Sequence, residues 1–276
     1  NTTADNNTAV GSLALNAATT SPGNVAIGKN AMLSATTGNG GNVIIGLNAG
    51  DAMTTAETNN ALGAEALTSL TTGGNNLAIG YDALGDITTV SSLTAVGHEA
   101  LAKNTSGTLS TAVGFRALKA NTTGANNTAV GNAALEDNTT GSNNVAVGQN
   151  ALKDNTTASY NIAVGSSSLA SNSTGAENVA MGHSAMFANT TASSNTAIGH
   201  NAMAANTTGA DNTACGRTSL ATNTTGNYNV AVGLNALNDN TTASYNTAVG
   251  YNSLALNTTG ASNTAVGYGA MIDTTT

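Results

Sequence analysis

The chain has 276 residues, of which 14 are acidic and six are basic, so its formal net charge is −8. Gly is abundant (32 residues) while Pro (one), Phe (two) and Trp (none) are nearly absent, which argues against an ordinary enzyme core. Because 40% of the residues are hydrophobic, the chain is not expected to be disordered. The scarcity of Lys and Arg argues against nucleic acid or an anionic membrane as a partner. The single Cys excludes a disulfide within the chain.

One repeat runs through the whole chain and is marked by a glycine that follows Ala and an aliphatic residue. The sixteen glycines, from Gly11 to Gly267, are spaced by 17 residues, except for 18 between Gly28 and Gly46, where residues 38–41 carry one extra. The consensus is N-T/V-A-V-G-x-x-A-L-x-x-N-T-T-G-x-x. A short period of this kind is typical of a solenoid, in which each repeat adds one coil that contacts its neighbours.

In chain order, each repeat is expected to hold two short strands. The paired β-branched residues favour strand over helix, and Gly and Asn supply the breaks. N-T-A-V-G is the first expected strand, A-L follows in a turn, N-T-T is the second strand, and G-x-x leads to the next coil. The pattern predicts an all-β parallel β-solenoid (β-roll) of about sixteen 17-residue coils. We expect residues 1–276 to form a single repeat domain and a segment of a longer fibre.

The distribution of charge separates the repeat into inward and outward positions. Counting from the glycine as position 0, no charged residue stands at −2, −1, +3, +4, +8 or +9. A buried ionised side chain costs on the order of several kcal/mol, so these columns are predicted to be buried or tightly stacked. The asparagines at −4 are predicted to form a ladder of carboxamides between coils. In the central repeats, the structural residues on this argument are Gly114, Gly131, Gly148, Asn127, Asn144, Val130, Val147, Leu135 and Leu152.

Self-association is expected because each coil has a thin core. Ordering a residue costs about 1.5 kcal/mol, which Val, Leu and Ala of one coil offset only in part. The Ala column at −2 is the expected surface of close approach between chains. Cys215, which replaces Val at −1, is expected to be a small core residue. The repeat is in register near both ends, which makes end-to-end filaments a further expectation.

Four segments carry a resemblance to a known family: Asn24–Gly28, Asn76–Gly80, Asn144–Gly148 and Asn178–Gly182. They resemble the N-S-V-A-I-G core repeat of trimeric autotransporter adhesin heads, and the match recurs over essentially the whole chain. The longer unit is similar to repeats in the shafts of phage tail fibres and related surface fibres. The resemblance implies a homotrimer of left-handed parallel β-rolls outside the cell, on a cell surface or virion appendage, that attaches to another surface.

Variable turns are the candidate contact sites. The positions just after the glycine carry aromatic and cationic residues, and such residues on a constant scaffold are suited to contact a receptor or glycan. His183 and His200 occupy this column in successive coils and could share a metal, although an exposed turn is the favoured interpretation because no third ligand joins them. The candidate contact residues are Tyr81, Phe115, Arg116, His183, Arg217, Tyr251 and Tyr268.

The N-T-T segment leaves two further interpretations open. Ten repeats, from Asn104 to Asn257, contain an N-x-S/T glycosylation sequence, but a buried ladder of these asparagines is favoured over a sugar column. The regular Thr columns also suggest ice binding as a function. This interpretation is weakened because adjacent Thr residues in a strand point to opposite faces, which leaves only one Thr column outward.

No nucleophile and base, paired carboxylates or phosphate-binding loop recurs, so we expect no enzyme and no cofactor. The expected function is a structural fibre or adhesin segment. The alternatives are a monomeric ice- or glycan-binding solenoid and a polysaccharide-degrading phage tail spike.

Overall fold

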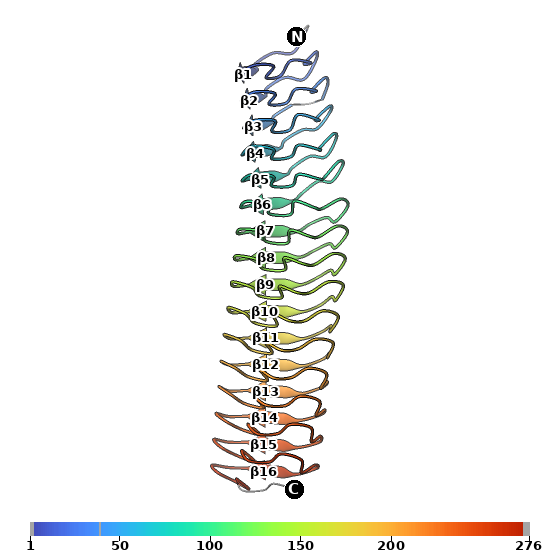
Figure 1. Ribbon diagram of the computed structural model, residues 1–276. Coiled ribbons are helices and arrows are strands. Elements are labelled where there is room, and N and C mark those ends of the chain that lie inside the picture. Colours follow the sequence, from blue (N-terminus) through green and yellow to red (C-terminus); the bar gives the residue numbers. More distant parts are fainter. Residues whose placement is uncertain (1–2, 39, 273–276) are drawn as a thin grey trace. The chain divides into compact units, whose positions relative to one another are not determined.

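The computed structural model describes residues 3–38 and 40–272. The chain forms two compact units, Asn1–Thr140 and Gly141–Thr276. Each unit is a stack of coils with one three-residue strand per coil (Figure 1). The first unit contains β1 (Thr8–Val10), β2 (Val25–Ile27), β3 (Val43–Ile45), β4 (Asn60–Leu62), β5 (Leu77–Ile79), β6 (Thr94–Val96), β7 (Thr111–Val113) and β8 (Thr128–Val130). The second contains β9 (Val145–Val147), β10 (Ile162–Val164), β11 (Val179–Met181), β12 (Thr196–Ile198), β13 (Thr213–Cys215), β14 (Val230–Val232), β15 (Thr247–Val249) and β16 (Thr264–Val266).

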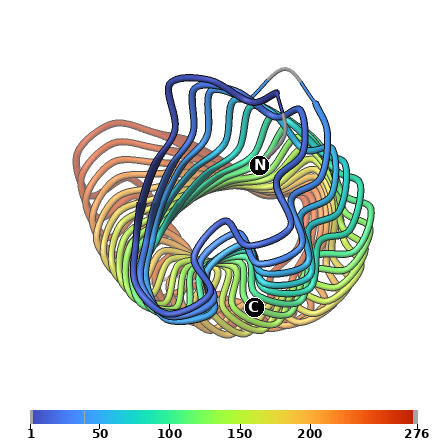
Figure 2. The same ribbon diagram turned by 90° about the horizontal axis from the view of Figure 1, so that it is seen from above.

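Within each unit, neighbouring strands pair in parallel and follow the order of the chain. Ala112 lies opposite Ala129 in the first unit and Ala180 opposite Ala197 in the second. At the one-residue insertion Ala26 pairs with Ile44, so the loop absorbs the extra residue and the sheet keeps its register. Successive coils of a unit follow one another closely when viewed along the stack (Figure 2). The predicted all-β parallel β-solenoid with 17-residue coils is confirmed.

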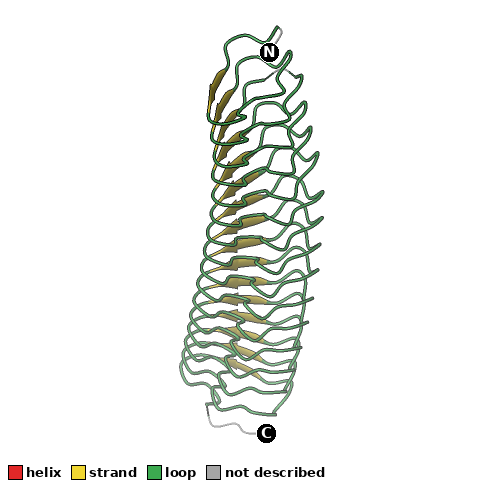
Figure 3. Ribbon diagram, turned by 45° about the horizontal axis from the view of Figure 1, so that its top comes forward, coloured by secondary structure: helices red, strands yellow, loops and turns green. Residues whose placement is uncertain are grey.

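The N-T-T segment is not a regular strand, so the prediction of two strands per coil is wrong. The strands lie along one side of each coil, and the rest of the coil is loop (Figure 3). Asn121 bends the chain because its amide Nδ2 donates to the carbonyl of Gly124 at 2.9 Å. Thr122 still connects coils, donating from its N–H (2.8 Å) and Oγ1 (3.0 Å) to the carbonyl of Thr139. The segment therefore pairs between coils without being extended.

The leucines at +4 fill the interior in an unusual backbone conformation. Leu135 and Leu152 are fully buried, with φ of 52° and 51°. A left-handed residue other than Gly costs about 1–2 kcal/mol. Complete burial of a leucine side chain contributes about 1.5–3 kcal/mol. Burial therefore outweighs the strain, and the turn after the glycine directs the leucine inward.

Two ladders of asparagine satisfy the polar interior. Asn178, at −4, donates its backbone N–H to Oδ1 of Asn161 at 2.9 Å, and Asn189, at +7, donates Nδ2 to Oδ1 of Asn172 at 2.8 Å. Both ladders also donate Nδ2 to the same carbonyl, that of Ala192, at 2.8 and 3.0 Å. A buried polar group without a partner costs about 1–3 kcal/mol, so the shared carbonyl stabilises the corner where the ladders meet. The predicted ladder at −4 is confirmed, and the ladder at +7 runs alongside it.

Candidate functional site

The outward side of the strands carries the −3 and −1 side chains, which we call the outer sheet face. Side chains alternate along a strand, so the −2 alanine of a three-residue strand points inward; Ala112 and Ala146 are fully buried. No charged residue occupies either outward column in any of the sixteen repeats. The −1 column consists of Val10, Ile27, Ile45, Leu62, Ile79, Val96, Val113 and Val130 in the first unit and Val147, Val164, Met181, Ile198, Cys215, Val232, Val249 and Val266 in the second.

This geometry overturns three expectations about burial. Val130 and Val147 are each 37% exposed, so the prediction of a buried −1 column is wrong. The −2 alanines lie inside the coil, so the Ala column is not a surface on which another chain could pack. Cys215 is exposed on the outer sheet face and is not a core residue. All three corrections follow from strand alternation, which lets only the middle residue point inward.

The outer sheet face of the first unit contains an apolar hollow of about 160 Å³. It spans three neighbouring strands, β3 to β5. Its lining consists of Val43, Ile45, Asn60, Ala61, Leu62, Leu77 and Ile79. The hollow is large enough for the end of an apolar side chain from another molecule.

The candidate turn residues form stacked columns. In the first unit, the ring centroid of His98 lies 5.1 Å from that of Tyr81 and 5.4 Å from that of Phe115. The guanidinium carbon of Arg116 lies 4.9 Å from the centroid of Phe115, within range of a cation–π interaction. The structure therefore brings Tyr81, Phe115 and Arg116 together, with His98 as the link between the two aromatic rings.

The remaining candidate turns lie in the second unit. Tyr251 and Tyr268 stack with centroids 5.2 Å apart, and Arg217 is an exposed residue of the same column. His183 and His200 stack at 5.3 Å with an interplanar angle of 12°. Among the residues that the structure describes, no group of three or more His, Cys, Asp or Glu is placed to hold a metal ion. Two imidazoles supply only half of a tetrahedral zinc site, so the geometry favours an exposed turn.

Glu99 is the centre of an ionic cluster beside the aromatic column. Its carboxylate accepts from Lys119 Nζ and Arg116 Nε, both at 2.8 Å. The hydrogen bond from Lys119, together with that from Arg116, lowers the pKa of Glu99 although burial opposes the shift. The Tyr81 hydroxyl bonds to Glu65, which raises the pKa of Tyr81. The ion pairs of Glu99 therefore link the coil of His98 to the next coil.

Three tyrosines at −5 form a further exposed column, which the sequence pattern was not used to predict. Tyr160, Tyr228 and Tyr245 are 62%, 52% and 62% exposed and adopt φ of 63°, 57° and 63°. Tyr228 and Tyr245 stack with centroids 5.1 Å apart. A bulky residue with positive φ is uncommon, which makes an exposed column of them a notable surface. Recurrence of Tyr directly before the −4 asparagine was the signal that could have revealed it.

The N-T-T columns have distinct environments. The sequon asparagines from Asn104 to Asn257 are buried, and their amide nitrogens donate within the +7 ladder, as in Asn206 and Asn223. This geometry favours the ladder over a sugar column. The second Thr, such as Thr123, is exposed while Thr122 is half-buried, but Thr88 and Thr89 are both exposed, so the expectation of a single outward column holds only for some coils. Asn127 and Asn144 are buried in the −4 ladder.

No protein-family model matches the chain, and no curated protein matches it. Within residues 3–38 and 40–272, no helix has the length and apolar character needed to cross a membrane.

Proposed function

We propose that the chain is a structural fibre or adhesin segment of an extracellular appendage, on a cell surface or a virion, and that copies associate through the outer sheet face. The observation that carries the proposal is the −1 column, which is apolar in every repeat although it points outward. The residues of a strand that face water are ordinarily polar. A continuous exposed apolar surface therefore marks an interaction site. Covering this face supplies the burial that a single thin coil lacks.

A second copy of the chain is the best occupant of this face. The apolar column repeats once per coil, at about 4.8 Å along the stack, and another copy has the same spacing. Eight strands with two outward columns present roughly 400 Å² in each unit, which a second copy of the same unit would cover. The resemblance to trimeric adhesin heads makes a homotrimer the expected assembly.

We assign attachment to the turns that directly follow the glycine at the end of each strand. The Tyr81–Phe115 column and the Tyr251–Tyr268 pair expose aromatic side chains on a scaffold held by repeated hydrogen bonds. Exposed aromatic and arginine side chains are typical centres of recognition. A surface receptor or glycan is the proposed partner.

Sedimentation velocity of wild type, Val232→Lys and Thr225→Lys tests the self-association. Val232 lies on the outer sheet face, whereas Thr225 is an exposed +9 residue of another face. We expect a wild-type trimer that Val232→Lys weakens by at least about tenfold, because a buried lysine would lack a partner, while Thr225→Lys assembles normally. A monomeric wild type, or normal assembly of a folded Val232→Lys protein, would contradict the proposal.

Ice binding is a second candidate, favoured by one specific observation. In β6 to β8 the outward residues alternate as Thr and Val, so Thr111 and Val113 present a methyl-rich pair on the same face. A regular face of this kind could order water when no other chain covers it. Thermal hysteresis of a monomeric sample would support this candidate, and its absence would remove it.

A further inference from the structure

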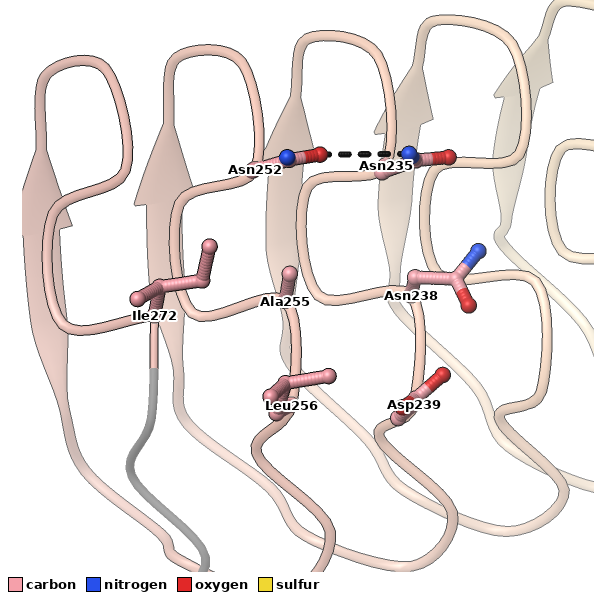
Figure 4. A pocket seen from close by; sticks show the side chains of 7 residues that line it. All are labelled: Asn235, Asn238, Asp239, Asn252, Ala255, Leu256 and Ile272. Atoms are coloured by element: carbon pink, nitrogen blue, oxygen red, sulfur yellow. Dashed lines mark hydrogen bonds between the residues drawn. The ribbon is translucent and has the colours of Figure 1, made fainter.

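A hollow of about 230 Å³ opens in the second unit among the turns that follow the glycines (Figure 4). Its walls come from three successive coils, at repeat positions +2, +5 and +6. These positions are distinct from the −3 and −1 columns of the outer sheet face. The lining residues are Asn235, Asn238, Asp239, Asn252, Ala255, Leu256 and Ile272.

Asn252 supplies a hydrogen-bond donor to this hollow. Asn235 Nδ2 donates to Asn252 Oδ1 at 3.1 Å, which orients the Asn252 amide with its nitrogen away from Asn235 (Figure 4). At the equivalent position of the next coil stands Gly269, which has no side chain to accept from it. Asn252 Nδ2 has no acceptor among the residues that the structure describes. The amide ladder therefore ends on a donor at the edge of the hollow.

Asp239 and Asn238 supply acceptors. Asp239 forms no ion pair with the described part of the chain, whereas Asp154, at the same repeat position, lies 3.1 Å from Lys153 Nζ. Asn238 uses Nδ2 to donate to the carbonyl of Thr218 at 3.0 Å, which leaves its Oδ1 able to accept. The hollow thus combines one carboxylate, one amide carbonyl and one amide donor.

The rest of the lining is apolar. Ala255, Leu256 and Ile272 form it, and Leu256 is 44% exposed. An exposed leucine beside polar side chains that can each form a further hydrogen bond is suited to a ligand with one apolar side and one polar side. The volume lies below the roughly 300–1,000 Å³ of sites for drug-sized ligands, which limits the occupant to a small ring.

We propose that this hollow binds one pyranose ring of a neutral glycan. Neighbouring sugar hydroxyls donate to Asp239 and Asn238, another hydroxyl accepts from Asn252, and the C–H side of the ring packs on Leu256 and Ile272. A calcium ion would need six to eight oxygen ligands, more than the hollow supplies. An anionic ligand would meet the Asp239 carboxylate, and none of the described residues that line the hollow is a cation that could offset it.

Methyl-group NMR on the intact protein, assembled or monomeric, tests the proposal, because Ala255, Leu256 and Ile272 place reporter methyl groups in the hollow. The probes are the methyl pyranosides of glucose, galactose and mannose and of N-acetylglucosamine, each to about 50 mM, enough to saturate a site with Kd near 1 mM. We expect saturable shifts of these methyl groups with at least one probe. Asp239→Asn should weaken binding by about tenfold, since it removes charge-assisted hydrogen bonds at nearly constant volume.

Asp211→Asn is the matched control, because it makes the same change at an exposed corner of the same unit, and it should bind as wild type does. Three results would overturn the proposal: no saturable shift with any probe, saturable shifts confined to methyl groups outside the hollow, or unchanged binding by Asp239→Asn. The site does not depend on self-association, so binding by a monomeric protein would contradict the proposed assembly and leave the glycan site supported.

Discussion

Gly233 and Gly267 share a backbone conformation but differ in what lies beside them. Their φ values are +131° and +127°, yet a Cβ on Gly233 would lie 2.5 Å from the carbonyl oxygen of Gly250, whereas one on Gly267 would meet none of the described residues within 4 Å. Gly267→Ala should lower the free energy of unfolding by about 1–3 kcal/mol through backbone strain alone. Gly233→Ala adds a clash with the next coil and should cost about 3–5 kcal/mol.

Urea denaturation followed by circular dichroism measures both losses, with wild type as the reference. A larger loss of unfolding free energy for Gly233→Ala would show that close packing of the next coil requires glycine in addition to its backbone conformation. Equal losses would show that the glycine column exists only for its backbone conformation.

At the residue scale, the absence of charge from a repeat position predicts burial correctly for some columns and wrongly for others. Leu135 and Asn127 are buried as the pattern indicates. Val130 belongs to a column equally free of charge, yet it points outward. Absence of charge cannot distinguish a column buried within the chain from an apolar column left for a partner. The direction of each side chain settles that question, and it depends on where the strand begins and ends.

At the element scale, β propensity predicts the Ala-Val strand but fails for N-T-T. The bend there depends on a side-chain bond from Asn121 to a carbonyl three residues on, which a count of β-branched residues does not detect. The hollow beside Asp239 was equally hidden, because it depends on which side chains stand at three repeat positions in successive coils. The period specifies the scaffold, and departures from the consensus create the sites.

The Glu99 cluster predicts a pH-dependent contribution to stability. The pKa of Glu99 is lowered in the folded chain, so its stabilising effect is complete above the ordinary value of 4.5 and is lost as the pH falls through the lower folded-state pKa. At pH 7, Glu99→Gln should reduce the free energy of unfolding by about 1 kcal/mol or less, because the ion pairs are partly exposed and screened by solvent. Thermal unfolding of both proteins between pH 7 and strongly acidic pH measures the difference.

Glu177→Gln provides the control for this pH series. Glu177 is an exposed turn residue without an ion pair in the described chain, and the substitution is chemically the same. We expect little difference from wild type at any pH. A Glu99→Gln deficit that persists unchanged in acid would assign the effect to packing and not to ionisation.

At the scale of the whole molecule, composition follows from the repeated cross-section. Twenty charged residues over sixteen repeats leave about one per coil, and the inward columns admit none. Within each unit, the hydrogen bonds of one coil reach the next coil, 17 residues away, as the Asn172–Asn189 and Asn189–Asn206 bonds illustrate. Stability is therefore expected to be the sum of local terms and interfaces between neighbouring coils.

Asn189→Ala tests how far a defect spreads through such a chain. The substitution removes amide bonds to Asn172 and Ala192 and an acceptor for Asn206, and should cost about 2–4 kcal/mol because the site is buried. Since each coil depends chiefly on its neighbours, hydrogen exchange measured by mass spectrometry should accelerate most in residues 172–206 and less with each coil beyond them. Thr191→Ala, at an exposed +9 position, is the control and should leave exchange nearly unchanged. A uniform acceleration over residues 3–272 would instead mean that the coils unfold as one cooperative unit.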